Sequence, residues 1–288
     1  MLFLQYDKFE LDKQYDQRAW APNAAEVIRR YTQRSEEVRV TLGEPAVFSY
    51  GASSVETLDL YATSAAAAPI HVFIHGGAWR LLSKRDSSFA AENFVRSGIH
   101  FIAIDFAQLP SASLEGMVAQ VRRAVAWVYE NAPKFDGDPA QIHISGHSSG
   151  GHLAACVAVT DWVSEFGLPP DIVKSVICAS GIYDLRPVRL SARNDYVKLD
   201  AEAEQMLSPI RHLDRLSTSV FVACGSRESD EFKRQSREFA EALGPALAAP
   251  HTELQALNHF EVAETLANPE YGLGLAALRL IGTRDNSI

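Results

Sequence analysis

The stretch QIHISGHSSGGHLAACVAV, residues 141–159, decides the fold. It begins as a short apolar run typical of a buried strand and ends as an apolar run suited to a buried helix. Between the two runs, GHSSG at residues 146–150 matches the pattern G-x-S-x-G. A sharp strand-to-helix turn of this kind holds its central serine in a strained conformation, with the hydroxyl above the sheet. The pattern therefore predicts a nucleophilic Ser148.

The alternative for this glycine- and serine-rich turn is a phosphate-binding loop. Such a loop carries a lysine, which GHSSGGH at residues 146–152 lacks. We therefore keep the nucleophile hypothesis. It implies that the residue after the nucleophile, Ser149, donates its backbone N–H to an oxyanion hole instead of acting through its side chain.

Short apolar runs and helical patterns alternate on both sides of this motif. The other runs are residues 69–75, 99–106, 173–180 and 217–225, and the clearest helical pattern is 114–132. This alternation predicts an α/β fold with a mainly parallel sheet and helices on both faces. We expect one domain over residues 1–288.

Two segments outside this alternation are expected to cap the carboxyl edge of the sheet, where ligands bind in such folds. Residues 182–216 are too long for a simple connection and form a small cap insertion. Residues 1–36 are polar and aromatic, and they are expected to form pocket walls as well. A helix is predicted from Asn23, which with Glu26 matches a capping box.

A serine nucleophile needs a histidine base that follows it in the chain, in a loop after a later strand. The candidates are His212, His251 and His259. His212 falls in the expected cap, and His251 begins an expected strand, at the wrong end of the sheet. His259 lies just beyond the end of that strand, and we predict that it is the base.

The acid that orients this base should follow the strand at 217–225. Glu228, Asp230 and Glu231 are the candidates, and their positions do not separate them. Asp230 and Glu231 would also favour the start of the helix that follows. We therefore prefer Glu228 and leave Asp230 open.

Composition excludes several classes of protein. The net charge is −9, and no lysine or arginine cluster is long enough to track nucleic acid. No signal peptide or membrane-spanning run is recognised in the sequence, and the three widely spaced cysteines fit reduced thiols better than disulfides or a metal site. We expect a cytoplasmic protein without metal or cofactor, acting on a small molecule, with a homodimer left open.

The motifs together resemble the kynurenine formamidase (arylformamidase) branch of α/β-hydrolases, which is related to hormone-sensitive-lipase-like esterases. The resemblance rests on HGGAW at 75–79, GHSSGGH, the order serine–acid–histidine, and the segments 225–243 and 258–262. It implies an α/β-hydrolase fold and cleavage of small carboxylic esters or N-formyl or aryl amides through an acyl-enzyme. The branch commonly has aspartate where this chain has Glu228.

The resemblance also implies an oxyanion hole formed by the backbone of Gly76, Gly77 and Ala78 together with Ser149. Glycines there would let backbone N–H groups approach a developing negative charge. Trp79 and Phe260 flank these residues and either contact the substrate or belong to the core. Two rival functions remain at this stage: a carboxylesterase instead of a formamidase, and a non-catalytic small-molecule receptor on the same fold.

Overall fold

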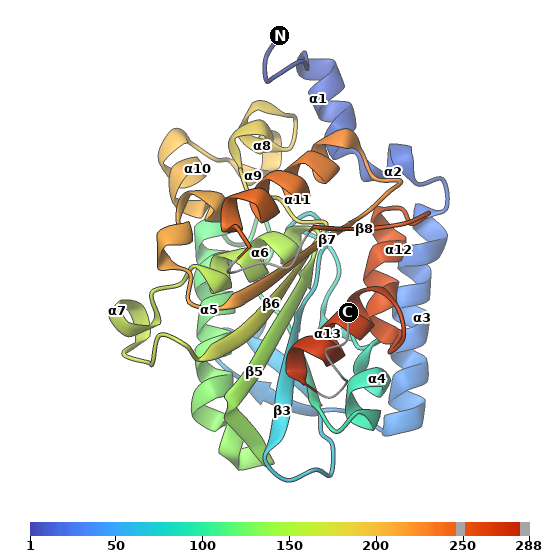
Figure 1. Ribbon diagram of the computed structural model, residues 1–288, viewed down its shortest axis with the longest axis vertical. Coiled ribbons are helices and arrows are strands. Elements are labelled where there is room, and N and C mark those ends of the chain that lie inside the picture. Colours follow the sequence, from blue (N-terminus) through green and yellow to red (C-terminus); the bar gives the residue numbers. More distant parts are fainter. Residues whose placement is uncertain (246–250, 283–288) are drawn as a thin grey trace.

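One eight-stranded sheet organises the molecule (Figure 1), and the computed structural model describes residues 1–245 and 251–282. The strand order is β1-β2-β4-β3-β5-β6-β7-β8. The strands are β1 (Ala46–Ser49), β2 (Thr57–Tyr61), β3 (Ala68–Ile74), β4 (His100–Ile104), β5 (Gly137–His147), β6 (Val173–Ala179), β7 (Ser219–Gly225) and β8 (Thr252–Leu254). The pairs β1–β2 and β2–β4 are antiparallel, and all others are parallel. The predicted mainly parallel sheet is confirmed.

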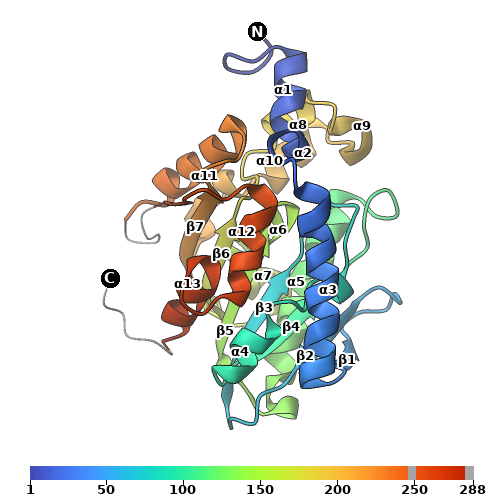
Figure 2. The same cartoon turned by 90° about the vertical axis from the view of Figure 1, so that its right-hand side faces the viewer.

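Helices cover both faces of the sheet, as Figure 2 shows. One face carries α5 (Leu114–Asn131), α6 (Ser149–Ala158) and α11 (Asp230–Leu243). The other carries α3 (Ala24–Leu42), α4 (Ala91–Arg96), α12 (His259–Glu264) and α13 (Gly272–Ile281). The remaining α-helices are α1 (Lys8–Tyr15), α2 (Gln17–Trp20), α7 (Trp162–Phe166), α8 (Arg186–Leu190), α9 (Asn194–Val197) and α10 (Ala201–Leu207). Among the described residues, no helix is long and apolar enough to cross a bilayer.

The sheet separates two hydrophobic cores, and strand β3 shows why. Ile70, Val72 and Ile74 belong to the core under α5 and α6, whereas Phe73 belongs to the core under α3 and α13. Side chains alternate between the faces of a strand, so a strand covered on both sides must be apolar at nearly every position. That is why β3 is a continuous apolar run.

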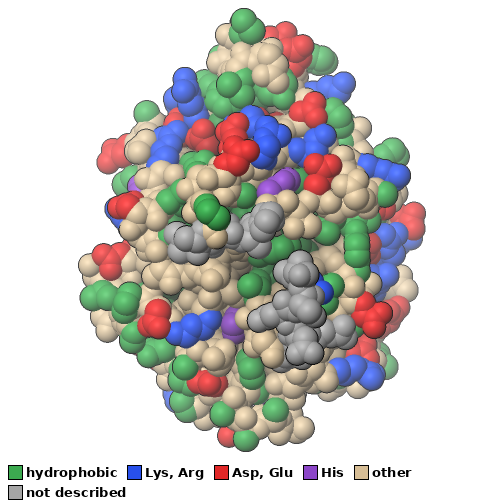
Figure 3. Space-filling view, in the orientation of Figure 1, with side chains coloured by type: hydrophobic (Ala, Val, Ile, Leu, Met, Phe, Trp, Pro, Cys, Tyr) green, Lys and Arg blue, Asp and Glu red, His purple; other side chains and the backbone are tan. Residues whose placement is uncertain are grey.

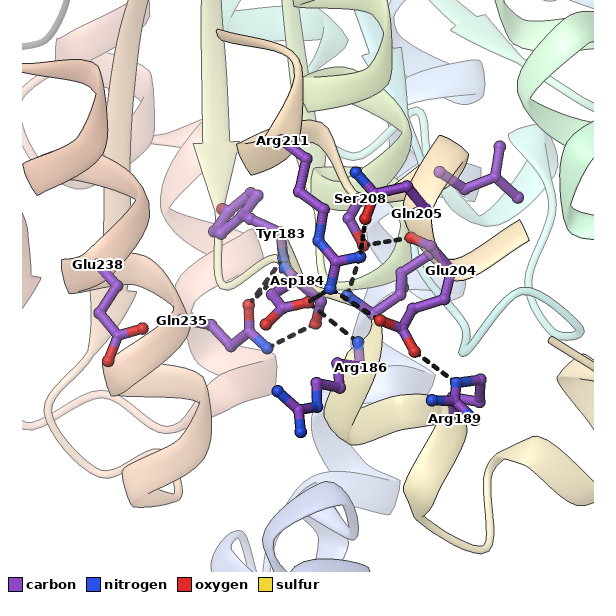
Figure 4. A network of polar contacts seen from close by, with 12 residues as sticks. Tyr183, Asp184, Arg186, Arg189, Glu204, Gln205, Ser208, Arg211, Gln235 and Glu238 are labelled. Atoms are coloured by element: carbon purple, nitrogen blue, oxygen red, sulfur yellow. Dashed lines mark hydrogen bonds and ion pairs between the residues drawn. The ribbon is translucent and has the colours of Figure 1, made fainter. Parts of the chain in front are cut away.

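The insertion at 182–216 folds into α8, α9 and α10 followed by two 3-10 turns, Pro209–Arg211 and Leu213–Arg215. A charge cluster ties these pieces together (Figure 4). Buried Glu204 accepts hydrogen bonds from Arg189 and Arg211, and Arg211 also pairs with Asp184 at 2.9 Å. Burial opposes the charge of Glu204, but the hydrogen bonds from the two arginines outweigh it and lower the pKa of this carboxyl.

Several histidines are buried in neutral form within this framework. His71 bonds the hydroxyl of Ser145 at 2.7 Å, and His143 bonds that of Ser175 at 2.8 Å. Burial lowers the pKa of His71 well below its usual value and lowers the pKa of His143 to about 4. The pKa of His152 in α6 is also lowered to about 4 by burial.

These histidines predict a loss of stability in mild acid. In the unfolded chain they titrate near pH 6.5, so between about pH 6.5 and 4 the unfolded state binds more protons and folding weakens as pH falls. At pH 5, His143 and His152 should each cost about 2 kcal/mol of unfolding free energy relative to pH 7.5. Urea unfolding at the two pH values measures this difference.

The variant His143→Asn should show a smaller pH dependence of stability than the wild type. His212→Asn is the matched control, because the His212 ring only bonds the Gln205 carbonyl at an exposed site. Equal unfolding free energies of the wild type at pH 7.5 and 5.0 would contradict the prediction.

Candidate active site

Ser148, Glu228 and His259 meet at the carboxyl edge of the sheet. His259 Nε2 lies 2.8 Å from Ser148 Oγ, and His259 Nδ1 lies 2.9 Å from Glu228 Oε2. Ser148 follows β5, Glu228 follows β7, and His259 is the first residue of α12. All three residues are at most 6% exposed. This geometry allows the histidine to take a proton from the serine while the carboxylate holds the imidazole in one orientation.

The turn around Ser148 is strained, as its sequence predicts. Ser148 has φ of +58°, and its backbone leads directly from β5 into α6. A Cβ on Gly146 would lie 2.0 Å from the Gly150 carbonyl oxygen, and one on Gly150 would lie 2.1 Å from the Ile74 carbonyl oxygen. Only glycine fits at either position, because real side chains do not approach backbone oxygens so closely.

Of the three candidate acids, the structure brings only Glu228 to the histidine. Its second oxygen, Oε1, accepts hydrogen bonds from Ser180 Oγ at 2.5 Å and from the Gly225 N–H at 2.7 Å. Asp230 has a side chain that is 68% exposed and pairs with Lys233. Glu231 is buried elsewhere, against Arg234. Of the three carboxylates, Glu228 is therefore the one placed to orient His259.

The other two histidines lie outside this cluster. His251 contacts the Cys224 thiol at 3.3 Å, and His212 bonds the Gln205 carbonyl in the insertion. His147, by contrast, packs against His259 with 4.8 Å between ring centroids and bonds the His259 carbonyl at 2.7 Å. Burial, together with the neighbouring His259, lowers the pKa of His147 well below its usual range. A neutral His147 can support His259 without adding a positive charge.

The start of α12 is fixed from the amino-terminal segment. Asn258 caps the helix by accepting the N–H groups of Phe260 and Glu261. Its side chain also donates to the Asn23 side chain at 2.8 Å, and Asn23 donates to Glu261 at 2.8 Å. The expectation that Asn23 forms a capping box with Glu26 is therefore wrong, because its side chain makes no cap bond on α3. Long-range contacts with α12 take its place.

Several supporting residues were missed by sequence reasoning. Ser180 follows β6 with φ of +49° and bonds the acid. Its position just after a strand at the carboxyl edge was the only available signal. Asn258 was missed although the sequence carries a signal for it. Asn258 and Glu261 match a capping box, which marks the start of α12.

The backbone after β3 presents unpaired N–H groups beside Ser148. Gly77 has φ of +108° and Ala78 φ of +54°, and in this described segment neither N–H donates a hydrogen bond. The N–H of Ser149 is at the first turn of α6, where helices leave donors free. Gly77 and Ala78 line the cavity with Ser148, whereas Gly76 and Ser149 are not among its lining residues.

The two glycines have a different reason from the expected one. A Cβ on Gly76 would lie 2.7 Å from the His147 carbonyl oxygen, and one on Gly77 would lie 2.0 Å from the Leu81 carbonyl oxygen. The space they leave is therefore taken by the protein's own backbone. Clearance for an approaching charge is a consequence of this tight turn.

Trp79 and Phe260, the two aromatic residues near the site, lie in different environments. Trp79 is 1% exposed, and its indole N–H faces His152 Nδ1 at 3.3 Å, so it belongs to the core. The prediction that it contacts substrate is not supported, because its ring packs in the core against His152 and does not line the cavity. Phe260 is half-buried and lines the cavity.

A cavity of about 660 Å³ opens above Ser148 and His259. Both expected capping segments contribute to its wall. The amino-terminal segment supplies Asp12, Tyr15, Asp16, Gln17, Arg18, Ile28 and Tyr31, and the insertion supplies Ser191, Ala192, Arg193 and Tyr196. Figure 3 shows one face of the molecule, with charged side chains of both signs gathered over its upper part.

The fold and the geometry at its carboxyl edge define an α/β-hydrolase. The thermostable carboxylesterase EstE1 has the same fold, with a TM-score of 0.66 at 18% identity over 91% of this chain and 98% of that chain. The family model named BD-FAE matches residues 58–243, and the chain belongs to that family.

Several relatives are similar to this chain over most of its length. The kynurenine formamidase of Danio rerio is 34% identical, covering 96% of this chain and 97% of its own. Esterase LipQ of Mycobacterium tuberculosis is 28% identical over 77% of this chain and 58% of its own. A solved structure from Silicibacter sp. TM1040 is 28% identical, covers 94% of this chain and 99% of its own, and superposes with a TM-score of 0.83.

Proposed function

We propose that this protein is a serine hydrolase of small carboxylic esters and N-formyl or aryl amides. The observation that carries the proposal is the pair of consecutive hydrogen-bond contacts from Ser148 to His259, at 2.8 Å, and from His259 to Glu228, at 2.9 Å. In it, Ser148 is the nucleophile, His259 the general base and Glu228 the group that orients the base.

In the proposed reaction, His259 Nε2 takes the Ser148 proton as Oγ attacks the substrate carbonyl carbon. The oxyanion that forms accepts hydrogen bonds from the free N–H groups of Gly77, Ala78 and Ser149. His259 then gives its proton to the leaving oxygen or nitrogen, which departs and leaves an acyl-enzyme. A water molecule, deprotonated by His259, attacks this ester, and the carboxylic acid and free serine are released.

The cavity supports substrates with a flat apolar group. Tyr31, Tyr196 and Phe260 line it together with Leu81 and Leu82, and its size of about 660 Å³ suits a small molecule. The kynurenine formamidases of Danio rerio and Salmo salar match nearly the whole chain at 34% and 31% identity, whereas esterase LipQ matches 77% of it at 28%. We therefore favour an N-formyl aryl amide over a simple ester as the better substrate.

Comparing kcat/KM for p-nitrophenyl acetate and N-formyl-L-kynurenine tests this choice. We expect both to be hydrolysed, with the higher kcat/KM for the formamide. A higher value for the acetate would make the protein a carboxylesterase. If neither compound is hydrolysed, the substrate proposal is wrong even if Ser148 is nucleophilic.

The non-catalytic receptor is the less favoured alternative. A receptor on this fold would have no need for a serine held at φ +58° against a histidine, a conformation that is costly to maintain. A buried glutamate that accepts three hydrogen bonds beside that histidine likewise favours catalysis.

A further inference from the structure

The residue after the proposed catalytic acid is held by the amino-terminal segment. Ser229 is fully buried and caps α11. Its hydroxyl donates to the Gln14 carbonyl at 2.7 Å and accepts from Gln17 Nε2 at 2.8 Å. Gln17 Nε2 also donates to the Gln14 carbonyl at 2.8 Å. The Gln17 amide thus bonds both the Gln14 carbonyl and the Ser229 hydroxyl. Ser229 is the residue directly after Glu228 in the chain.

A second set of contacts fixes the first turn of α11, two residues further on. Gln14 Oε1 accepts the Glu231 N–H at 3.1 Å, and the Tyr15 hydroxyl donates to Glu231 Oε1 at 3.0 Å. Gln14 and Gln17 are 8% and 4% exposed, so water cannot replace these bonds at low cost. Buried hydrogen bonds here join residues more than 200 positions apart in the chain.

The same short segment also forms part of the cavity wall. Gln17 lines the cavity, and the Tyr15 carbonyl accepts a hydrogen bond from Arg193 of the insertion at 2.6 Å. In Figures 1 and 2, α1 and α2 lie above the sheet edge, and α1 lies beside α8. Helix α1 contacts both α11 and α8. The segment therefore bridges the insertion, the cavity and the loop that carries the acid.

We propose that Gln17 is a positioning residue that holds Glu228 in place through Ser229. The inference rests on the proposed function, because it assigns Glu228 a role in the reaction. A carboxylate orients an imidazole only within a few tenths of an ångström, and a shift of about 1 Å can cost two orders of magnitude in rate. The Gln17 amide supplies a second donor both to Ser229 Oγ, which also accepts the Phe232 N–H, and to the Gln14 carbonyl, which also accepts the Ser229 hydroxyl.

The variant Gln17→Met tests this role because methionine keeps the length of the side chain but has no donor. We expect kcat for p-nitrophenyl acetate to fall about tenfold while KM changes less than about twofold, since the small substrate scarcely touches the cavity wall. Gln17→Glu should lose as much, because an ionised carboxylate cannot donate. Gln33→Met is the matched control: Gln33 is exposed on α3 and bonds only Glu37.

A double-mutant cycle separates positioning from general structural damage. In the Glu228→Gln background, Gln17→Met should lower the rate of fluorophosphonate labelling by less than about twofold, because the group it positions is already disabled. A tenfold lower labelling rate for Gln17→Met in the Glu228→Gln background would overturn the proposal. A wild-type kcat for the single variant Gln17→Met would overturn it as well. If Gln17→Met does not fold, Ser229→Ala should show the same kcat loss and the same non-additivity.

The proposed function fails independently of this inference. If wild type and Ser148→Ala hydrolyse the acetate equally, the serine mechanism is wrong. If Ser148→Ala is inactive and the wild type active, the double-mutant cycle tests only the positioning role of Gln17.

Discussion

Ser148→Ala is expected to lower kcat for ester and amide substrates at least about 10⁴-fold, the loss seen when a serine nucleophile is removed and only binding and oxyanion stabilisation remain. The substitution keeps the Cβ, so it should not disturb the turn at φ +58°. The hydroxyl has one close partner, His259 Nε2 at 2.8 Å. The loss therefore reports chemistry and not folding.

Labelling with a fluorophosphonate probe checks this result directly. The wild type should be modified at Ser148, and Ser148→Ala should not react. Ser217→Ala is a matched control, since the Ser217 hydroxyl only bonds the Pro170 carbonyl at an exposed site. It should keep both labelling and activity. Labelling that persists in Ser148→Ala would show that another side chain is the nucleophile.

Glu228→Gln is the second variant with a large expected effect. Its kcat should fall about 10³- to 10⁴-fold. The three groups around this carboxylate, Ser180 Oγ, the Gly225 N–H and His259 Nδ1, all donate hydrogen bonds. A glutamine has one oxygen and one NH₂ group, so at least one donor must face another donor. Turning the NH₂ toward His259 favours the wrong tautomer of the imidazole, with its proton on Nε2.

Asp230→Asn is the matched control for this variant. Asp230 lies two residues along the chain and has a 68% exposed side chain, so its kcat should stay within about twofold of the wild type. Thermal unfolding of both variants should accompany the kinetics, because Glu228 also anchors two loops. A loss in Asp230→Asn equal to that in Glu228→Gln would reject the assignment of the acid.

The local features of this protein were readable from short stretches of sequence. The continuous apolar run of β3, and the turn at Ser148 with its flanking glycines, depend on residues that are neighbours in the chain. The position of His259 followed from chain order and the direction of parallel strands. Backbone sterics and burial within a few residues suffice for such predictions.

Contacts over long sequence separations could not be read in the same way. Asn23 matched a capping pattern, yet its side chain turns to Asn258 and Glu261, because a tertiary partner competed with the local one. Trp79 and Phe260 looked alike in sequence, but one is in the core and the other lines the cavity. Nothing in the sequence around Ser180 or Gln17 indicated that either supports the acid loop.

The sequence by itself determined the α/β fold with its mainly parallel sheet, the turn that presents Ser148, and the histidine expected beside it, because each follows from local patterning and strand order. Only the tertiary structure decided that Glu228 and not Asp230 faces His259, and that Gln17 bonds Ser229 in the loop after β7. Those outcomes depend on which buried donors and acceptors meet when segments about 30 to 220 residues apart pack together. Burial makes an unpartnered polar group costly, and only the folded chain shows which partner each group finds.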